Sequence, residues 1–308
     1  MIQIWVPTER TAQALAGIDG IKADVVVPAA GALPASAADV EFYVPPFTPD
    51  LMGDSTAESV LTQLPRLKVV QTLTAGVDNL LPHIPAGITF CNARGVHDTS
   101  TAEWAVAAIL ASIREFPYFA AEQAASRWSY RSTGCLAGRT VLIVGYGSIG
   151  AAVERRLDGF GVTVVRVARR AREGVSSVSE LDSLLPAADV VVLLVPVTSQ
   201  TTGMVDAAFL ARMKDGALLV NAARGSIVVT EALCAELAGG RLTAALDVTE
   251  PEPLPEGHPM WAMPNVFITP HVAASTPAST AAMLDFLQQQ VLRFQSGTPL
   301  VNVITGDY

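Results

Sequence analysis

The stretch VLIVGYGSIG at residues 141–150 decides the fold. Its apolar start predicts a buried strand, and the G-x-G-x-x-G that follows predicts a tight turn that opens a helix. Gly145 permits the turn, Gly147 lets the backbone approach a pyrophosphate, and Gly150 lets the helix pack closely on the strand. The N–H groups and positive dipole end of that helix favour an anion. We therefore expect a dinucleotide-binding turn that includes Ser148 and Ile149, rather than a purely structural turn.

On both sides of this turn, apolar β-branched runs alternate with segments of helical period, which is typical of parallel α/β layers. Before the turn, the expected strands are 2–6, 25–27, 42–44, 69–73 and 89–91. In the second set they are 141–144, 162–167, 190–195, 218–221, 243–247 and 266–268. The segments of crossover-helix length between them are 149–159, 178–185, 206–213 and 231–237. This pattern predicts doubly wound sheets.

Two long helices are expected to link the lobes of the chain. The Ala-rich segment 99–114 starts with Ser and Thr and precedes the glycine-rich turn, so it is expected to connect two lobes. The helix at 276–294 follows the last strand, so the chain can return to the first lobe. We expect a discontinuous, flavodoxin-like substrate domain of residues 1–95 and 273–308, and a Rossmann-like dinucleotide-binding domain of residues 96–272.

Composition narrows the function classes. The chain has 308 residues, of which 50% are hydrophobic, and a net charge of -9. No apolar run approaches the roughly 20 residues of a membrane span, and the N-terminus lacks a signal-peptide pattern. The three cysteines are far apart without metal-ligand spacing. We expect a cytoplasmic protein with reduced thiols, no metal site, and neither nucleic acid nor membrane as partner.

The end of the strand after the glycine-rich turn indicates which dinucleotide fits. An acidic residue there would bind the adenine ribose of NAD(H), but the chain has Ala168, Arg169 and Arg170, with Arg172 two positions further on. A small residue followed by guanidinium groups leaves room for a 2′-phosphate and neutralises it. We therefore expect NADP(H) to be preferred, with NAD(H) possible. The alternative is that these arginines are simply solvated surface residues.

Three residues that could carry chemistry follow strands of the second set. Arg224 lies in NAARGS, Glu252 in TEPEPL and His271 in TPHVAA. Ligands of doubly wound folds bind at the carboxyl edge of the sheet, where these segments begin. Arg can bind a carboxylate and polarise a carbonyl group, and His can donate a proton near neutral pH. Each residue by itself also has a structural interpretation, and spacing alone does not bring the three together.

With these residues in view, the chain resembles the D-isomer-specific 2-hydroxyacid dehydrogenases, a family that includes glyoxylate/hydroxypyruvate reductases. The similar stretches cover most of the chain: TAGVDNL at 74–80, TAEWAVAAIL at 101–110, GYGSIG at 145–150, LLVPVTSQTTGMV at 193–205, NAARGSIV at 221–228, ALDVTEPEPLP at 245–255 and NVFITPHVAAST at 265–276. The resemblance implies an interdomain cleft that closes by hinge motion, and a homodimer whose contact includes the helix near 101–114.

The resemblance also implies residue roles. The catalytic Arg, Glu and His fall on Arg224, Glu252 and His271, and the loop whose N–H groups bind the substrate carboxylate, together with Arg224, falls on Thr74, Ala75 and Gly76. Asp247 falls beside the nicotinamide, where we expect it to orient the carboxamide or support the site electrostatically. The other positions expected to line the cofactor, besides His271, are Val195, Pro196, Thr201, Asn221, Ala222 and Ala223.

Four positions differ from those of particular relatives. Ala168 replaces the acidic residue of NAD-preferring members, which agrees with the interpretation of Arg169 and Arg170. Thr249 stands where an aromatic residue is frequent, Ala75 where phosphite-oxidising relatives have Lys, and Glu252 where formate-oxidising relatives have Gln. The leading hypothesis is therefore an NADP(H)-dependent reductase of glyoxylate, hydroxypyruvate or a similar 2-keto acid. The alternative is a nucleotide-sensing binding protein with little turnover, similar to the C-terminal-binding corepressors, which share the fold and the three catalytic residue types.

Overall fold

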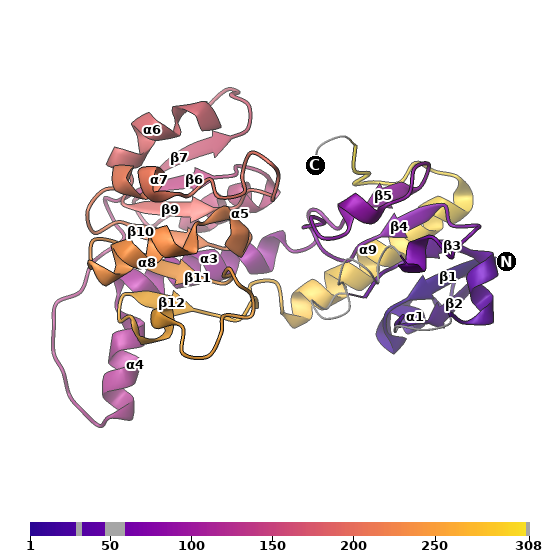
Figure 1. The fold of residues 1–308 in the computed structure, drawn as a ribbon, viewed down its shortest axis with the longest axis horizontal. Helices are drawn as coiled ribbons and strands as arrows, with labels where there is room; N and C mark the ends of the chain where they lie inside the picture. The colour runs from indigo at the N-terminus through magenta and orange to yellow at the C-terminus, as the bar shows by residue number, and fades with distance from the viewer. Residues whose placement is uncertain (29–32, 47–58, 306–308) are drawn as a thin grey trace. The chain divides into compact units, whose positions relative to one another are not determined.

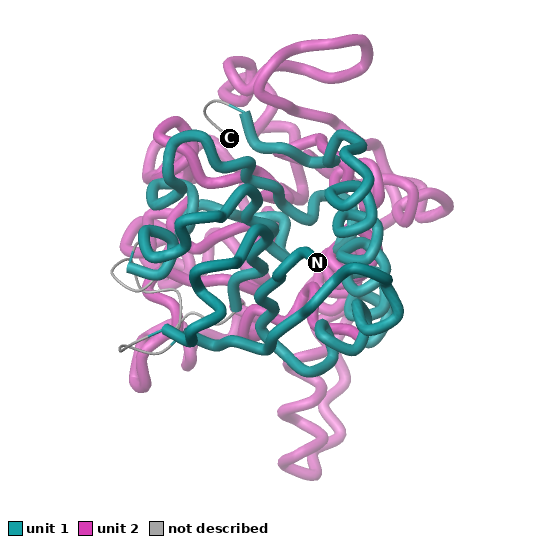
Figure 2. Tube along the Cα trace, turned by 90° about the vertical axis from the view of Figure 1, so that its right-hand side faces the viewer, with its two compact units in different colours: residues 1–97, 277–308 teal, residues 98–276 magenta. Residues whose placement is uncertain are grey.

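The computed structural model describes residues 1–28, 33–46 and 59–305. These residues form two compact units, shown in Figures 1 and 2, each built on a parallel sheet. The first unit contains residues 1–97 and 277–308, and the second contains residues 98–276. The expected fold class, two parallel-sheet α/β domains, is confirmed.

The first unit has a five-stranded sheet in the order β2-β1-β3-β4-β5. Its strands are β1 (Ile2–Val6), β2 (Ile21–Val25), β3 (Val40–Tyr43), β4 (Val69–Gln71) and β5 (Thr89–Cys91). Side chains alternate between the faces, so Ile4 packs under α1 (Glu9–Leu15) and α9 (Pro277–Ser296), while Trp5 enters the core on the opposite face. The C-terminal helix is therefore part of the first unit.

The expected strand at 25–27 is wrong, because β2 occupies Ile21–Val25 and the two ranges share only Val25. This edge strand carries Lys22 and Asp24, whose charged groups lie 3.7 Å apart. The continuous apolar residues are Val25, Val26 and Val27, which lie at the end of β2 and after it, so an apolar pattern predicts the strand too late in the chain. Charged residues suit an edge strand because it borders solvent.

The second unit has a seven-stranded sheet in the order β12-β11-β10-β9-β6-β7-β8. Its strands are β6 (Thr140–Val144), β7 (Thr163–Ala168), β8 (Ser176–Ser177), β9 (Val190–Leu193), β10 (Leu218–Asn221), β11 (Thr243–Leu246) and β12 (Val266–Ile268). From β6 the chain first adds β7 on one side and then β9 on the other, so the topological switch point lies between β6 and β9. Nucleotides bind at such points in doubly wound sheets.

Helices cover both faces of this sheet. The core around α3 (Asp98–Ile113) and α5 (Ser148–Leu157) lies on one face, and the core around α6 (Leu181–Leu184), α7 (Ala207–Arg212) and α8 (Thr230–Ala238) lies on the other. One further helix, α4 (Phe116–Ala124), extends away from the unit in Figure 1. The described 3-10 turns are η1 (Ala35–Asp39), η3 (Leu81–His83), η4 (Val178–Glu180), η5 (Leu185–Ala187), η6 (Gly225–Ile227) and η7 (Pro259–Ala262).

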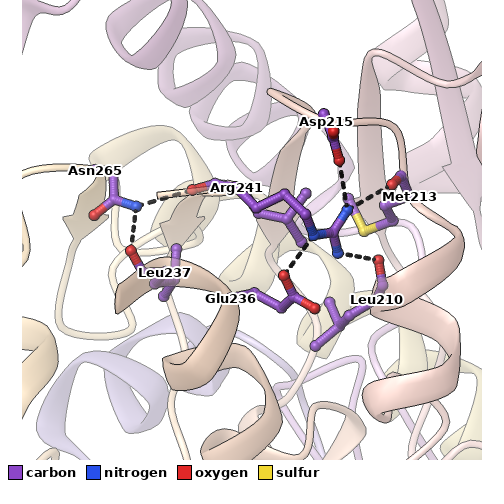
Figure 3. Close-up of polar contacts among 8 residues, drawn as sticks. Leu210, Met213, Asp215, Glu236, Leu237, Arg241 and Asn265 are labelled. Atoms are coloured by element: carbon purple, nitrogen blue, oxygen red, sulfur yellow. Dashed lines mark hydrogen bonds and ion pairs between the residues drawn. The ribbon is translucent and has the colours of Figure 1, made fainter. Parts of the chain in front are cut away.

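Arg241, just before β11, ties two helices of the second unit together (Figure 3). Its guanidinium donates to the carbonyl groups of Leu210 and Met213 at the end of α7, at 2.6 and 2.8 Å, and to Glu236 of α8 at 2.6 Å. A cation at the end of a helix satisfies carbonyl groups that have no partner within the helix. These contacts join the ends of α7 and α8 to the start of β11, so we assign the cluster a structural role.

Across the described ranges, none of the helices combines the length and the apolar character that a membrane span needs. The same residues contain no group of three or more His, Cys, Asp or Glu side chains placed to hold a metal ion.

Candidate active site

The glycine-rich turn lies at the switch point of the second sheet. Gly145 has a φ of +105°, and a Cβ there would lie 2.5 Å from the carbonyl carbon of Leu194, directly after β9. A Cβ on Gly150 would lie 2.9 Å from the carbonyl oxygen of Gly145. Gly147 differs, because its φ of -98° is open to other residues and a Cβ there would meet no atom within 4 Å. Gly145 and Gly150 therefore serve packing, while Gly147 leaves open space at the N-terminus of α5.

Tyr146, which was not among the expected site residues, anchors this turn. Its N–H donates to the carbonyl of Val167 at 2.8 Å, and its hydroxyl donates to Glu154 of α5. Arg166 of β7 forms an ion pair with the same carboxylate and holds the pKa of Glu154 below its ordinary value. Arg172 donates to the Tyr146 carbonyl at 2.6 Å. Turn, helix and strand are thus fixed to one another around one aromatic ring.

The residues expected to select the dinucleotide lie at the end of β7. Ala168 is its last residue, and the exposed Arg169 and Arg170 follow. Arg172 lies in the same loop, so its bond to Tyr146 connects the arginine-rich loop to the glycine-rich turn. Cationic groups and open backbone therefore occur together at this corner of the second unit, which suits a phosphorylated ligand.

His271 and Glu252 form a hydrogen-bonded pair. Nδ1 of His271 lies 2.6 Å from Oε1 of Glu252, and each side chain is about one-third exposed, at 33% and 31%. An ionised carboxylate only accepts hydrogen bonds, so this contact places a proton on Nδ1. Nε2 is then the ring nitrogen that can exchange a proton with a ligand.

The surroundings of Glu252 keep it ionised. Burial raises the pKa of this carboxyl. Four effects together outweigh burial: the hydrogen bond from His271, the charges of His271 and Arg224, and a backbone hydrogen bond from Thr249. The net result is a pKa below the ordinary value. A carboxylate that is ionised near neutral pH favours the doubly protonated form of a neighbouring imidazole.

Arg224 follows β10 and reaches the same region. Asn221 holds the loop: its Nδ2 donates to the Arg224 carbonyl at 2.9 Å and its Oδ1 accepts from the N–H of Ala223 at 3.0 Å. The next residue, Gly225, packs so closely that a Cβ would lie 1.9 Å from the carbonyl oxygen of Thr249. The loop that carries Arg224 and the loop that leads to Glu252 are therefore in contact.

Asp247 lies beneath His271 and is 2% exposed. Its Oδ1 accepts from the N–H of Val272 at 2.9 Å and its Oδ2 from the N–H of Ala273 at 2.8 Å. Its backbone carbonyl accepts from the N–H of His271 at 2.7 Å. In the structure this side chain binds the His271 loop, and its expected role beside the nicotinamide, orienting the carboxamide or supporting the site electrostatically, stays a prediction.

The remaining residues expected to bind cofactor lie on the loops after β9 and β10 and on the first turn of α5. Thr201 donates to the carbonyl of Pro196 at 2.6 Å, which closes the loop that Val195 begins. The N–H of Ala222 lies 3.4 Å from the carbonyl of Leu193. Ser148, on the first turn of α5, donates to Asp98 at 3.0 Å. These segments all border the carboxyl edge of the second sheet.

The expected substrate loop lies in the first unit, after β4. Thr74 donates to the carbonyl of Gly76 at 2.8 Å, Asn92 donates to that of Ala75 at 2.7 Å, and the N–H of Ala93 donates to that of Thr74 at 2.8 Å. All three carbonyl groups are occupied, so the orientation of the peptide planes is fixed. Asn92 was not predicted, because its role depends on β5 lying beside β4.

Comparison with known proteins gives consistent matches. The family profile described as "D-isomer specific 2-hydroxyacid dehydrogenase, NAD binding domain" matches residues 106–273. The chain is 34% identical to a glyoxylate reductase of Thermofilum pendens over 262 residues, which cover 80% of this chain and 77% of that protein. It is 33% identical to a D-3-phosphoglycerate dehydrogenase of Archaeoglobus fulgidus over 80% of this chain but only 48% of that longer protein.

Among solved structures, an NADPH-dependent glyoxylate/hydroxypyruvate reductase from Sinorhizobium meliloti, crystallised with NADP and sulfate, superimposes with a TM-score of 0.84. The two sequences are 29% identical, and the alignment covers 99% of this chain and 98% of that chain. The fold similarity therefore includes both units, each with its own sheet.

Proposed function

The chain is an oxidoreductase of the D-isomer-specific 2-hydroxyacid dehydrogenase family, and we propose that it transfers a hydride between NADP(H) and a small 2-keto or 2-hydroxy acid. We propose specifically a reductase of the glyoxylate/hydroxypyruvate type. The observation that carries the proposal is the His271–Glu252 hydrogen bond of 2.6 Å, next to the loop of Arg224. This arrangement offers a proton donor and a cation at the carboxyl edge of the sheet.

Each residue has a separate task in reduction. Arg224 binds the substrate carboxylate and polarises the keto group, because a guanidinium is a planar, permanently charged donor. When bound, the reduced nicotinamide supplies the hydride that reaches C2 of the keto acid. Nε2 of His271 donates a proton to the oxygen that becomes the alcohol, and Glu252 stabilises the imidazolium form through Nδ1. In the oxidative direction His271 accepts that proton.

Cofactor preference belongs to this proposal as well. Ala168 removes the carboxylate that would repel a 2′-phosphate, and Arg169 and Arg170 supply positive charge beside it. Gly147 leaves the space that the pyrophosphate requires at the N-terminus of α5. We propose NADP(H) as the preferred cofactor, with Asn221, Ala222 and the loop from Val195 lining the nicotinamide side.

The substrate class follows from the carboxylate-binding groups. The carbonyl groups of Thr74, Ala75 and Gly76 accept hydrogen bonds that fix the peptide planes of this loop. We propose that the loop binds the substrate carboxylate through its backbone. Relatives are named for glyoxylate reductase and for D-3-phosphoglycerate dehydrogenase activity. We favour a small 2-keto acid because Ala75 adds no cationic group for a phosphate.

We also propose a cytoplasmic homodimer. The described cysteines are unpaired, which suits a reducing compartment. Beyond α3, helix α4 and the segment after it form an arm in which Arg127 donates to Glu122 at 2.9 Å. On this arm Trp128 is 99% exposed and Tyr130 is 91% exposed. Exposed aromatic side chains of this size are typical of an interface, and we propose a second copy of the chain as the partner.

Steady-state oxidation of NADPH and NADH against glyoxylate, hydroxypyruvate, pyruvate and bulkier 2-keto acids tests the proposed function. We expect turnover on the small acids with a lower KM for NADPH than for NADH. Binding of NADPH without turnover on any acid would contradict the reductase assignment and favour the nucleotide-sensing alternative. A preference for NADH would contradict the role of Arg169 and Arg170.

A further inference from the structure

A hydrogen-bonded relay runs from the long helix α3 to the loop of His271. The indole Nε1 of Trp104 lies 3.0 Å from Oγ1 of Thr269, and that oxygen lies 2.6 Å from Oδ1 of Asp247. An indole N–H can only donate and a carboxylate only accepts. The hydroxyl of Thr269 must therefore accept from Trp104 and donate its single proton to Asp247, so the direction of the relay is fixed.

Asp247 connects Thr269 to the loop of His271 through hydrogen bonds. Besides Thr269, its carboxylate accepts from the N–H groups of Val272 and Ala273 at 2.9 and 2.8 Å. Its backbone carbonyl accepts from the N–H of His271 at 2.7 Å. The carboxylate is thus tied on one side to α3 through Thr269 and on the other to the two residues that follow His271.

The constraint is needed because His271 has an unfavourable backbone. Its φ is +53°, in the left-handed region, which is sterically unfavourable for a residue other than Gly. Such a conformation persists only where surrounding contacts enforce it. The side chain of His271 is hydrogen-bonded to Glu252, whereas its backbone N–H donates to the backbone carbonyl of Asp247. Losing the relay would free the loop without removing either group of the His271–Glu252 pair.

We infer that Trp104 and Thr269 are positioning residues for His271, acting through Asp247. The inference rests on the proposed function in one respect only, that His271 is the proton donor. The indole orients the hydroxyl, the hydroxyl fixes the carboxylate rotamer, and the carboxylate holds the two N–H groups that set the direction of the imidazole. Because small displacements of a catalytic group lower rates steeply, the relay affects kcat more than cofactor binding.

The test compares variants that differ by one hydrogen-bonding group. Thr269→Val removes the hydroxyl with little change in shape, Thr269→Ser restores it, and Trp104→Phe removes the indole N–H. Trp261→Phe is the matched control, because the Trp261 indole donates to the carbonyl of Pro255 and the residue is 54% exposed. We expect Thr269→Val to lower kcat about tenfold and Trp104→Phe to lower it about threefold, with KM for NADPH within about twofold of the parent. Thr269→Ser and Trp261→Phe should retain the parent kcat.

Amide hydrogen exchange gives a readout that does not depend on activity. In Thr269→Val the N–H groups of Val272 and Ala273 should exchange faster, while those of β6 remain as in the parent. An unchanged kcat and unchanged exchange in Thr269→Val would overturn the inference. So would an equal loss in Thr269→Ser, because that would indicate a packing effect. If Thr269→Val does not fold, Trp104→Phe decides, since it leaves the hydroxyl and the carboxylate in place.

A His271→Ala variant measured in parallel separates the two claims. If His271→Ala abolishes turnover while Thr269→Val and Trp104→Phe turn over normally, the relay is wrong and the proposed function stands. If His271→Ala retains the parent rate, the proposed role of His271 is wrong, and any change of exchange in Thr269→Val then reports only on loop structure.

Discussion

His271 and Glu252 are joined by a hydrogen bond of 2.6 Å although they reach the site from different loops. Glu252 follows β11 and His271 follows β12, and these two strands are neighbours in the sheet. Parallel pairing places the carboxyl ends of both strands at the same edge of the sheet. The loops that follow the two strands therefore bring the carboxylate and the imidazole together. The topology of the second unit therefore creates the pair on which the account rests.

Replacing Glu252 with Gln should lower kcat while KM for NADPH stays near the parent value. The amide preserves the shape but cannot stabilise an imidazolium, so we expect a loss of about tenfold or more. The measurement is steady-state reduction of glyoxylate with saturating NADPH. Glu256→Gln is a suitable control, since Glu256 is an exposed carboxylate of the same segment. A normal kcat in Glu252→Gln would contradict the role of the carboxylate.

The same variant predicts a pH-dependent difference in stability. The pKa of Glu252 is lowered in the folded protein, against about 4.3 in the unfolded chain. Its ionised form therefore stabilises the fold fully above the unfolded pKa, and this contribution is lost as pH falls through the lower folded value. We expect the difference in Tm between parent and Glu252→Gln to be largest near neutral pH and to shrink below about pH 4. A difference that grows on acidification would contradict this sign.

Two glycine substitutions should have opposite consequences. Gly147→Ala should leave Tm close to the parent, because its Cβ meets nothing within 4 Å, and should raise KM for NADPH by filling space meant for the phosphates. Gly225→Ala should lower Tm, because its Cβ would lie 1.9 Å from the carbonyl oxygen of Thr249. Thermal unfolding and cofactor KM check both variants, with Gly17→Ala as control. Normal NADPH binding in Gly147→Ala would place the pyrophosphate elsewhere.

Removing positive charge after β7 should change cofactor selectivity. We expect the double variant of Arg169→Ala and Arg170→Ala to raise KM for NADPH by about tenfold or more and to leave KM for NADH nearly unchanged. Arg155→Ala removes an exposed cation from α5 and serves as the control. If both cofactors were affected equally, these arginines would act on a group common to NADH and NADPH.

Substituting the exposed aromatic residues of the arm should weaken self-association. We expect the parent to have the mass of a dimer by light scattering, and Trp128→Ser combined with Tyr130→Ser to shift the population toward the monomer. Phe160→Ser, which alters an exposed aromatic residue elsewhere on the second unit, is the control. A monomeric parent would contradict the proposed assembly.

Much of the second unit could be predicted because its central strands are continuous apolar runs. The expected 218–221 is the observed β10, 190–195 exceeds β9 by two residues, and 243–247 exceeds β11 by one. Strands buried on both faces have this pattern. The edge strand β2 could not be found in this way, and neither could α4, which contributes no buried residue to either core.

In the candidate site, too, local motifs could be predicted from the sequence, whereas contacts between distant segments could not. The glycine-rich turn is a local motif, so its strand and helix were predictable from ten consecutive residues. The His271–Glu252 pair depends on which strands are neighbours, and only the family resemblance connected the two residues in advance. The contacts of Tyr146 with Arg172 and of Trp104 with Thr269 join segments far apart in the chain. No spacing rule encodes such contacts, so they required the structure.

The most direct test of the central claim is a single-turnover measurement of NADPH oxidation by glyoxylate and hydroxypyruvate, made on the parent and on His271→Ala. We predict that both proteins bind NADPH with similar affinity, that the parent oxidises it with at least one of these acids, and that His271→Ala does so about a hundredfold more slowly. Oxidation by His271→Ala at the parent rate, or a parent that binds NADPH and oxidises it with neither acid, would contradict the account.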